Sequence, residues 1–183
     1  MKKILAMIKD VEFSNDNSLL LHHNEGESGL TYFGIYESAH PNWYGWNVIK
    51  RYLVNTPDLK ECSKILANVS DLNQKVEEFY KKEFFDKMKL DLVKSVDKQE
   101  EIMCFAINVG LKPCIKKLQE CLGVKVDGII GQQTINALNA FDESLFDKLF
   151  DIEEKEYYDS LPSRLDRYKK GLKNRADKYW VVK

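Results

Sequence analysis

The stretch VKVDGIIGQQTINAL, residues 124–138, says most about how this chain folds. Gly128 and Gly131 flank an apolar pair, and glycine permits turn conformations that its β-branched neighbours resist. From Thr134 onward apolar residues recur at helical spacing, so we expect a helix to begin there or at Gln132. The pattern predicts a tight turn that leads into a helix.

An expected helix at residues 114–123, CIKKLQECLG, precedes this turn. Together with that helix, the D-G-x-x-G turn and the following T-x-x-A-L resemble the peptidoglycan-binding helical module of cell-wall hydrolases. The resemblance implies a wall-binding second half, with peptidoglycan as the partner. It also directs attention upstream, to carboxylates that can cut a glycan.

The chain has 183 residues, 44% of them hydrophobic, and a formal net charge of −1. This length supports one compact domain, or a lobed domain with a closely packed helical second half. Basic and acidic residues are interspersed, whereas nucleic-acid binding usually needs a strong basic excess. We therefore expect no nucleic-acid partner, and we expect a monomer.

The N-terminus carries no clear targeting signal. A signal peptide needs a longer apolar region than residues 4–8, which Lys9 and Asp10 interrupt, and it needs a small-residue cleavage site. No apolar stretch approaches membrane-spanning length, so we expect no membrane insertion. We expect synthesis in the cytoplasm, followed by holin-type or secretion-system release to the cell wall.

The cysteines show no C-x-x-C pairing, and without secretion we expect reduced thiols rather than disulfides or a metal site. Cys114 and Cys121 lie seven residues apart on one expected helix, so both should face the core. The four cysteines are Cys62, Cys104, Cys114 and Cys121.

Helical patterns dominate outside an irregular polar segment near the N-terminus. Residues 13–44 are rich in Asn, Ser, Gly and His, and we expect a loop there with a short hairpin of residues 19–21 against 32–36. Besides the helices already named, helices are expected at residues 1–12, 46–54, 60–68, 72–93, 98–109, 144–161 and 164–179. The fold class is therefore mainly α.

We place a first region at residues 1–97 and a second, helical region at residues 98–183. No Pro-, Gly- or Ser-rich linker separates residue 93 from residue 102, so we expect the second region to pack on the first.

The irregular segment contains the carboxylates that glycoside hydrolysis needs. One carboxylic acid must protonate the leaving oxygen, usually opposite a second carboxylate or a held water. Glu12 lies between the apolar first helix and Phe13, where partial burial can keep an acid protonated near neutral pH. Glu27 and Thr31 lie in a glycine-flanked loop, where a carboxylate and a hydroxyl can contact one water.

A helix-end Glu, a second acid and a Thr resemble the Glu–acid–Thr triad of phage-type lysozymes. More closely, the chain is similar to glycoside hydrolase family 108, lysozyme-like N-acetylmuramidases followed by a helical peptidoglycan-binding region. The matching pieces are Glu12, GLTYFGI at 29–35 against G-x-T-x-F/Y-G-I, FAINVG at 105–110 against A-V-N-x-G, and GLKNR at 171–175 against G-W-x-N-R. The sequence departs from the family at Cys104, where an Asp is usual, and at Leu172, where a Trp is usual.

This resemblance implies a lysozyme-like fold and cleavage of the β-1,4 bond between N-acetylmuramic acid and N-acetylglucosamine. It implies Glu12 as the general acid, Glu27 as the second carboxylate and Thr31 as the residue that holds water, without a cofactor. The missing signal peptide suits a phage or prophage endolysin. Expected substrate contacts are Glu25, His23, Tyr32, Trp43 and Asn108.

Adjacent histidines on an extended segment point to opposite faces, and no third ligand has diagnostic spacing. We therefore expect His22, His23 and His40 to hold no metal, with a structural or substrate-contact role instead.

Each catalytic assignment has a structural alternative. Glu12 can be an ordinary helix-end carboxylate, Glu27 a solvated loop acid with Glu25 as its substitute, and Thr31 a residue that pins the turn. A Trp cluster at a helix start, such as that around Trp43, is more often core than a sugar platform.

The function has alternatives too. The chain can be a non-catalytic wall-binding or structural protein on the same scaffold. It can also be a wall amidase or peptidase, although that chemistry normally needs a zinc site or a Cys–His pair.

Overall fold

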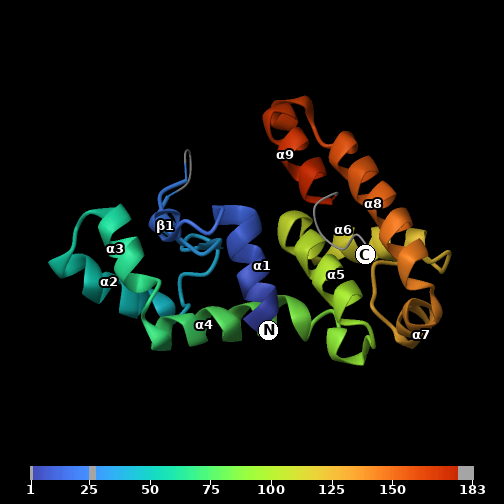
Figure 1. The fold of residues 1–183 in the computed structure, drawn as a ribbon, viewed down its shortest axis with the longest axis horizontal. Helices are drawn as coiled ribbons and strands as arrows, with labels where there is room; N and C mark the ends of the chain where they lie inside the picture. The colour runs from blue at the N-terminus through green and yellow to red at the C-terminus, as the bar shows by residue number, and fades with distance from the viewer. Residues whose placement is uncertain (1, 25–27, 177–183) are drawn as a thin grey trace. The chain divides into compact units, whose positions relative to one another are not determined.

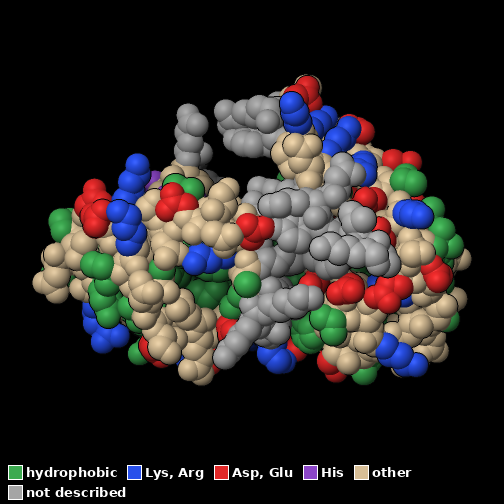
Figure 2. All heavy atoms as spheres, viewed as in Figure 1, with side chains coloured by type: hydrophobic (Ala, Val, Ile, Leu, Met, Phe, Trp, Pro, Cys, Tyr) green, Lys and Arg blue, Asp and Glu red, His purple; other side chains and the backbone are tan. Residues whose placement is uncertain are grey.

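The computed structural model describes residues 2–24 and 28–176, and the chain forms two compact units, Met1–Lys81 and Lys82–Lys183. Helices make up most of both units, and the described strands all lie near the N-terminus (Figure 1). The expected mainly α, lysozyme-like fold with a small hairpin segment is confirmed. Acidic and basic side chains are interspersed on the face shown in Figure 2. In the described part of the chain, no helix has both the length and the apolar character to cross a bilayer.

The first unit begins with helix α1, Lys2–Phe13. Ile8 and Phe13 are buried, which fixes the helix against the rest of the unit. Ser14 and Asn15 then adopt left-handed φ angles of 49° and 59°, and the Asn15 amide donates to Asp10 Oδ1 at 2.7 Å. A left-handed residue ends a right-handed helix, so the chain turns sharply directly after Phe13.

Three short antiparallel strands follow, in the order β1 (Leu21–His22), β2 (Thr31–Tyr32) and β3 (Ile35–Tyr36). The two-residue turn between β2 and β3 has positive φ angles at both Phe33 (52°) and Gly34 (78°). Two left-handed residues are what a tight hairpin turn of this twist requires. A hairpin segment is confirmed, and residues 32–36 contribute to two of its strands. The strand expected at residues 19–21 is instead Leu21–His22, because Leu19 ends a 3-10 turn, Asn17–Leu19.

Helices α2 (Gly45–Asn55), α3 (Leu59–Leu66) and α4 (Ser70–Tyr80) complete the first unit. Helix α3 contacts β1, and the buried Ser63 hydroxyl makes the connection. It donates to Asn17 O and accepts from Leu21 N at 3.0 Å. These two hydrogen bonds connect α3 to the segment that leads into β1, so the hairpin is held against this helix.

The continuous helix expected over residues 72–93 is wrong. Helix α4 ends at Tyr80, a π-helical turn covers Lys81–Phe85, and a 3-10 turn covers Leu90–Leu92. Met88 and Leu90 are both fully buried, yet residues two apart point to opposite sides of an α-helix. Burying both requires the chain to leave the helical path, and it does so through a left-handed Lys89.

The second unit is built from α-helices packed around an aromatic core. Helix α6 contacts both α5 and α8, and α8 contacts α9, the orange and red pair in Figure 1. Phe146 and Phe150 stack with ring centroids 5.1 Å apart, and Phe105 meets Phe150 edge-on. The helices are α5 (Val96–Val109), α6 (Leu111–Cys121), α7 (Gln132–Ala140), α8 (Glu143–Ser160) and α9 (Asp166–Ala176).

The four cysteines are free. Cys62 and Cys114 are buried, as expected of core thiols, whereas Cys104 and Cys121 are half-buried. Cys121 therefore faces the core only in part.

The turn at residues 124–131 is organised by a side chain from the preceding helix. The Gln119 amide oxygen accepts from Asp127 N (3.0 Å) and Gly128 N (2.8 Å), and its nitrogen donates to Asp127 Oδ1 at 2.9 Å. Gly128 needs its freedom, since its φ is +73°. Gly131 does not: its φ is −113°, and the expectation of a special conformation there is wrong. Helix α7 begins at Gln132, one of the two expected starts.

The described structure divides after Lys81. The boundary expected after residue 97, and the packing of the second region on the first, stay predictions.

Candidate active site

The last turn of α1 brings Glu12 to the hairpin. Glu12 is half-buried, and it lies close enough to Tyr80 of α4 to act on the hydroxyl of that residue. Burial raises the pKa of Tyr80 far above its ordinary value, and the charge of Glu12 raises it further. The Tyr80 hydroxyl donates to Phe33 O at 2.7 Å, inside the β2–β3 turn. The Phe13 and Phe33 rings, 5.6 Å apart, also join the helix end to this turn.

The fit between Tyr80 and the turn depends on a glycine. A Cβ at Gly34 would lie 2.9 Å from the Tyr80 hydroxyl oxygen, and the φ of +78° already disfavours any other residue. The motif Thr31-Tyr32-Phe33-Gly34 therefore carries a structural requirement. Gly34 lets the buried hydroxyl reach the Phe33 carbonyl, which places the turn beside Glu12.

One face of the small sheet carries polar groups. Thr31 pairs with His22 on one side and Tyr36 on the other, so these three side chains share a face. Asn24 connects two of them: its amide nitrogen donates to Thr31 Oγ1 at 3.2 Å, and its Oδ1 lies 3.0 Å from His22 Nε2.

Tyr36 on this face is 40% exposed, and it also contributes to the raised pKa of Tyr80. Tyr36 and Glu12 are therefore both near the buried Tyr80 hydroxyl.

Two of the three expected catalytic residues lie among the described residues. Glu12 lies beside the hairpin, and Thr31 is on that hairpin, 3% exposed, with its hydroxyl bonded to Asn24. That bond agrees with the alternative in which Thr31 pins the loop, and its catalytic role stays a prediction. Glu25 and Glu27 lie outside the described residues.

A further carboxylate in this region, Glu37, has a structural role. It accepts from Leu30 N at 3.0 Å and pairs with Lys50 at 2.6 Å. The Lys50 bond and then the Leu30 N–H hold the pKa of Glu37 below its ordinary value. Glu37 is ionised at neutral pH and cannot act as a general acid there. It fastens the base of the hairpin.

The expected substrate contact at Tyr32 is corrected, because Tyr32 is 0% exposed and its ring stacks on Trp43 with centroids 6.4 Å apart. Its hydroxyl faces the interior near Cys62, so it cannot touch a ligand in this conformation. Tyr36 is the tyrosine of this hairpin that solvent reaches. Side chains alternate between the two faces of a strand, so the register of the hairpin identifies Tyr36 as the residue on the polar face.

The other expected contacts differ in setting. His23 is exposed, and its Nδ1 lies 2.8 Å from Gly29 O. Trp43 is half-buried in an aromatic cluster, so tightly that a Cβ at Gly45 would lie 2.2 Å from its ring. Asn108 is half-buried in the last turn of α5, in the second unit. These assignments stay predictions.

Sequence reasoning did not select Asn24, Tyr36 or Tyr80 for this site, and it gave His22 a structural or substrate-contact role only. The signal for Tyr80 was a helical stripe, which marks burial but not a bond to a turn 47 residues earlier. Among residues 2–24 and 28–176, no group of three or more His, Cys, Asp or Glu could hold a metal ion.

Two family models match the chain. One, described as glycosyl hydrolase 108, matches residues 19–110, and the other, described as a predicted peptidoglycan domain, matches residues 113–177. The first match begins after Glu12. The solved structure of SagA from Brucella abortus is similar to this one, with a TM-score of 0.64. The two sequences are 19% identical, and the match covers 98% of this chain and 97% of the SagA chain. This likeness shows a shared fold. No curated protein matches the chain.

Proposed function

We propose that this chain, which belongs to the glycosyl hydrolase 108 family, is an N-acetylmuramidase with Glu12 as its general acid. Membership of this family makes it a glycoside hydrolase that acts on peptidoglycan. The bond cut is the β-1,4 bond between N-acetylmuramic acid and N-acetylglucosamine. The observation that carries the proposal is the packing of the Phe13 ring, next to Glu12 at the end of α1, on the Phe33 ring of the β2–β3 turn, with Glu12 near the buried Tyr80 hydroxyl that bonds to this turn.

The reaction begins with proton transfer from the Glu12 carboxylic acid to the glycosidic oxygen. The bond between that oxygen and the anomeric carbon of N-acetylmuramic acid then breaks, and positive charge develops on the sugar ring. A carboxylate on the opposite side, which we assign to Glu27, stabilises this charge. Water, which the Thr31 hydroxyl positions, adds to the anomeric carbon and gives up a proton to one of the two carboxylates, Glu12 or Glu27.

The surroundings of Glu12 support this role. A general acid must keep its proton near neutral pH, and removal from water beside aromatic rings is a common way to achieve that. Glu12 is half-buried and adjoins Phe13, whose ring packs on Phe33. The sugar contacts that we propose are the exposed Tyr36 and His23 and the half-buried Trp43.

The biological setting is also a proposal. We propose that the protein acts as a monomer on peptidoglycan, as a phage or prophage endolysin made in the cytoplasm. Holin-type or secretion-system release then brings it to the cell wall.

The test compares Glu12→Gln with wild type in the loss of turbidity of purified peptidoglycan. Glutamine keeps the shape but cannot donate the proton, so lysis should fall about 10²–10⁴-fold. The matched control is Glu61→Gln, which changes an exposed carboxylate on α3 in the same unit and should leave lysis unchanged. Near-normal lysis by Glu12→Gln at wild-type melting temperature would show that Glu12 is not the acid.

Mass spectrometry of the fragments separates the alternatives. A muramidase leaves new reducing ends on N-acetylmuramic acid. Free stem peptides without new reducing ends would identify an amidase. An intact wall that nevertheless binds the wild-type protein would identify a non-catalytic wall-binding protein.

A further inference from the structure

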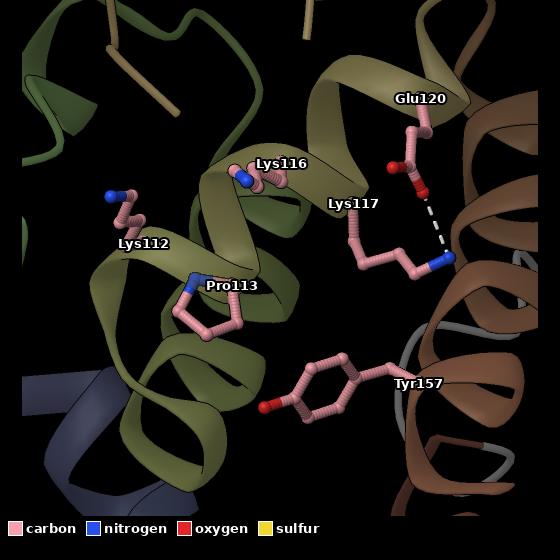
Figure 3. Close-up of a pocket in the computed structure, with 6 residues that line it drawn as sticks. All are labelled: Lys112, Pro113, Lys116, Lys117, Glu120 and Tyr157. Atoms are coloured by element: carbon pink, nitrogen blue, oxygen red, sulfur yellow. Dashed lines mark ion pairs between the residues drawn. The ribbon is translucent and has the colours of Figure 1, made fainter. Parts of the chain in front are cut away.

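The second unit contains a cavity of about 320 Å³ between α6 and α8 (Figure 3). This volume lies at the lower end of the range of about 300–1,000 Å³ that is typical of small-ligand sites. All but one of the lining residues fall within the predicted peptidoglycan domain. The lining residues are Lys112, Pro113, Lys116, Lys117, Glu120 and Tyr157.

The charges around this cavity are only partly balanced. Lys117 lies 2.8 Å from Glu120 and 2.8 Å from Glu153, so carboxylates of the protein already neutralise it. Lys112 and Lys116 are exposed, and neither pairs with a carboxylate of the described residues. Four residues apart on α6, they present two adjacent positive charges on one face.

The turn motif positions these two lysines. At Gly128, a Cβ would lie 3.3 Å from Lys112 Cγ and 3.5 Å from Lys116 Cγ. The bare backbone of the turn therefore lies against both aliphatic stems. Packing of the stems reduces the entropy that each charged group loses when it binds a ligand. The lysines are thus better prepared for an anion than free surface lysines are.

The rest of the lining is apolar. Tyr157 extends from α8 toward Pro113 of α6 (Figure 3). Its ring meets Phe105 edge-on with centroids 5.7 Å apart, which fixes it from the core side. Tyrosine and proline rings together offer a surface for the apolar face of a sugar or for a methyl group.

We propose that this cavity binds a carboxylate of the peptidoglycan stem peptide. Lys112 and Lys116 contact the carboxylate, and Pro113 and Tyr157 pack against the adjoining alanine or sugar. The glycan strand itself is neutral, because its amines are acetylated and its lactyl groups are joined to peptide, so the free carboxylates of the polymer lie on the peptide. The proposal rests on the proposed function for the identity of the polymer. It adds that the second unit recognises strands that carry their peptides.

Binding is measured by calorimetry on the full-length protein with soluble fragments too short to be cut. The probes are the wall disaccharide with a tetrapeptide and the same disaccharide without peptide, its lactyl carboxylate capped as an amide so that it carries no charge. We expect Lys112→Gln/Lys116→Gln to weaken tetrapeptide binding at least tenfold. Each hydrogen bond to a charged group contributes enough binding free energy for about a tenfold change in affinity. The control, Lys94→Gln/Lys148→Gln, makes the same charge change at exposed sites elsewhere in the unit and should bind like wild type.

Two results would overturn the proposal: unchanged tetrapeptide binding by the Lys112/Lys116 variant, or equally tight wild-type binding of the peptide-free disaccharide.

A glycan-cleavage assay on peptide-free strands keeps the two proposals separate. A protein that cuts these strands but binds tetrapeptide without lysine dependence refutes this inference alone. A protein that cuts none but binds with lysine dependence refutes the proposed activity alone.

Discussion

Replacing Gln119 by leucine should destabilise the second unit by about 2–4 kcal/mol. The side chain is 1% exposed, and its amide oxygen is the acceptor for the backbone N–H groups of Asp127 and Gly128. Leucine has a similar volume, so the change adds little cavity cost. It leaves two N–H groups without an acceptor, each at about 1–3 kcal/mol when buried. The turn is partly exposed, so we take the lower part of that range.

Two measurements check this prediction. For a chain of this size the loss corresponds to a fall in melting temperature of roughly 4–16 °C, followed by circular dichroism or calorimetry. An NMR titration follows Asp127, whose pKa is lowered chiefly by the hydrogen bond from Gln119 and next by the N–H of Ile129. Loss of the Gln119 bond should raise this pKa toward its ordinary value.

The control is Gln133→Leu, which alters an exposed glutamine at the start of α7 and should change stability by no more than about 0.5 kcal/mol. Suppose that Gln119→Leu melts like wild type and that the Asp127 titration is unchanged. The turn would then be held by the backbone conformation of Gly128 and the burial of Ile130, and the role given to Gln119 would be refuted.

Three further predictions concern the turn at the active site, pH and metal. Gly34→Ala should lower the free energy of unfolding by about 1–3 kcal/mol, because it places a Cβ at positive φ and 2.9 Å from the Tyr80 oxygen. The control, Gly171→Ala, lies in an open helical position and should raise the free energy of unfolding by about 0.5–1 kcal/mol. Equal melting temperatures of the two variants would contradict this. Burial, and then the charge of Glu154, raises the pKa of Glu101 to about 10 from its ordinary 4.5, so the folded state retains a proton that the unfolded chain releases above about pH 4.5. Stability should therefore fall between pH 5 and pH 9, and Glu101→Gln should flatten that slope; a melting temperature that rises over this range would refute the reasoning. EDTA should leave lysis unchanged, since two carboxylates suffice for glycosidic cleavage, and a loss that zinc restores would favour the amidase alternative.

Local sequence features predicted several parts of the molecule well. The end of α1 follows an apolar stripe, and the hairpin follows from a polar segment with Gly34 between aromatic and β-branched residues. Asp58 and Ser95, which were not singled out from the sequence, cap α3 and α5 by accepting from N–H groups of the first turn, and both are residue types preferred at helix starts. These features depend on contacts within a few residues, so a sequence pattern can reveal them.

Other features depend on partners far along the chain. The burial of both Met88 and Leu90 interrupts a stretch whose periodicity favours helix. Strand alternation alone did not distinguish Tyr32, which is buried under Trp43, from Tyr36, which is exposed. The choice between them required the pairing register of β2 and β3.

The sequence by itself determined the mainly α class, the hairpin, the candidate acid at the end of the first helix and the D-G-x-x-G turn. It could do so because helix periodicity, turn glycines and capping residues act locally. Only the tertiary structure decided that the end of α1 packs on the turn at Phe33, with Glu12 near the Tyr80 hydroxyl, and that Gln119 organises the backbone around Gly128. It alone placed the stems of Lys112 and Lys116 against that turn. These are contacts of buried polar groups and packed side chains, whose partners are set by the folded chain as a whole and leave no periodic mark in the sequence.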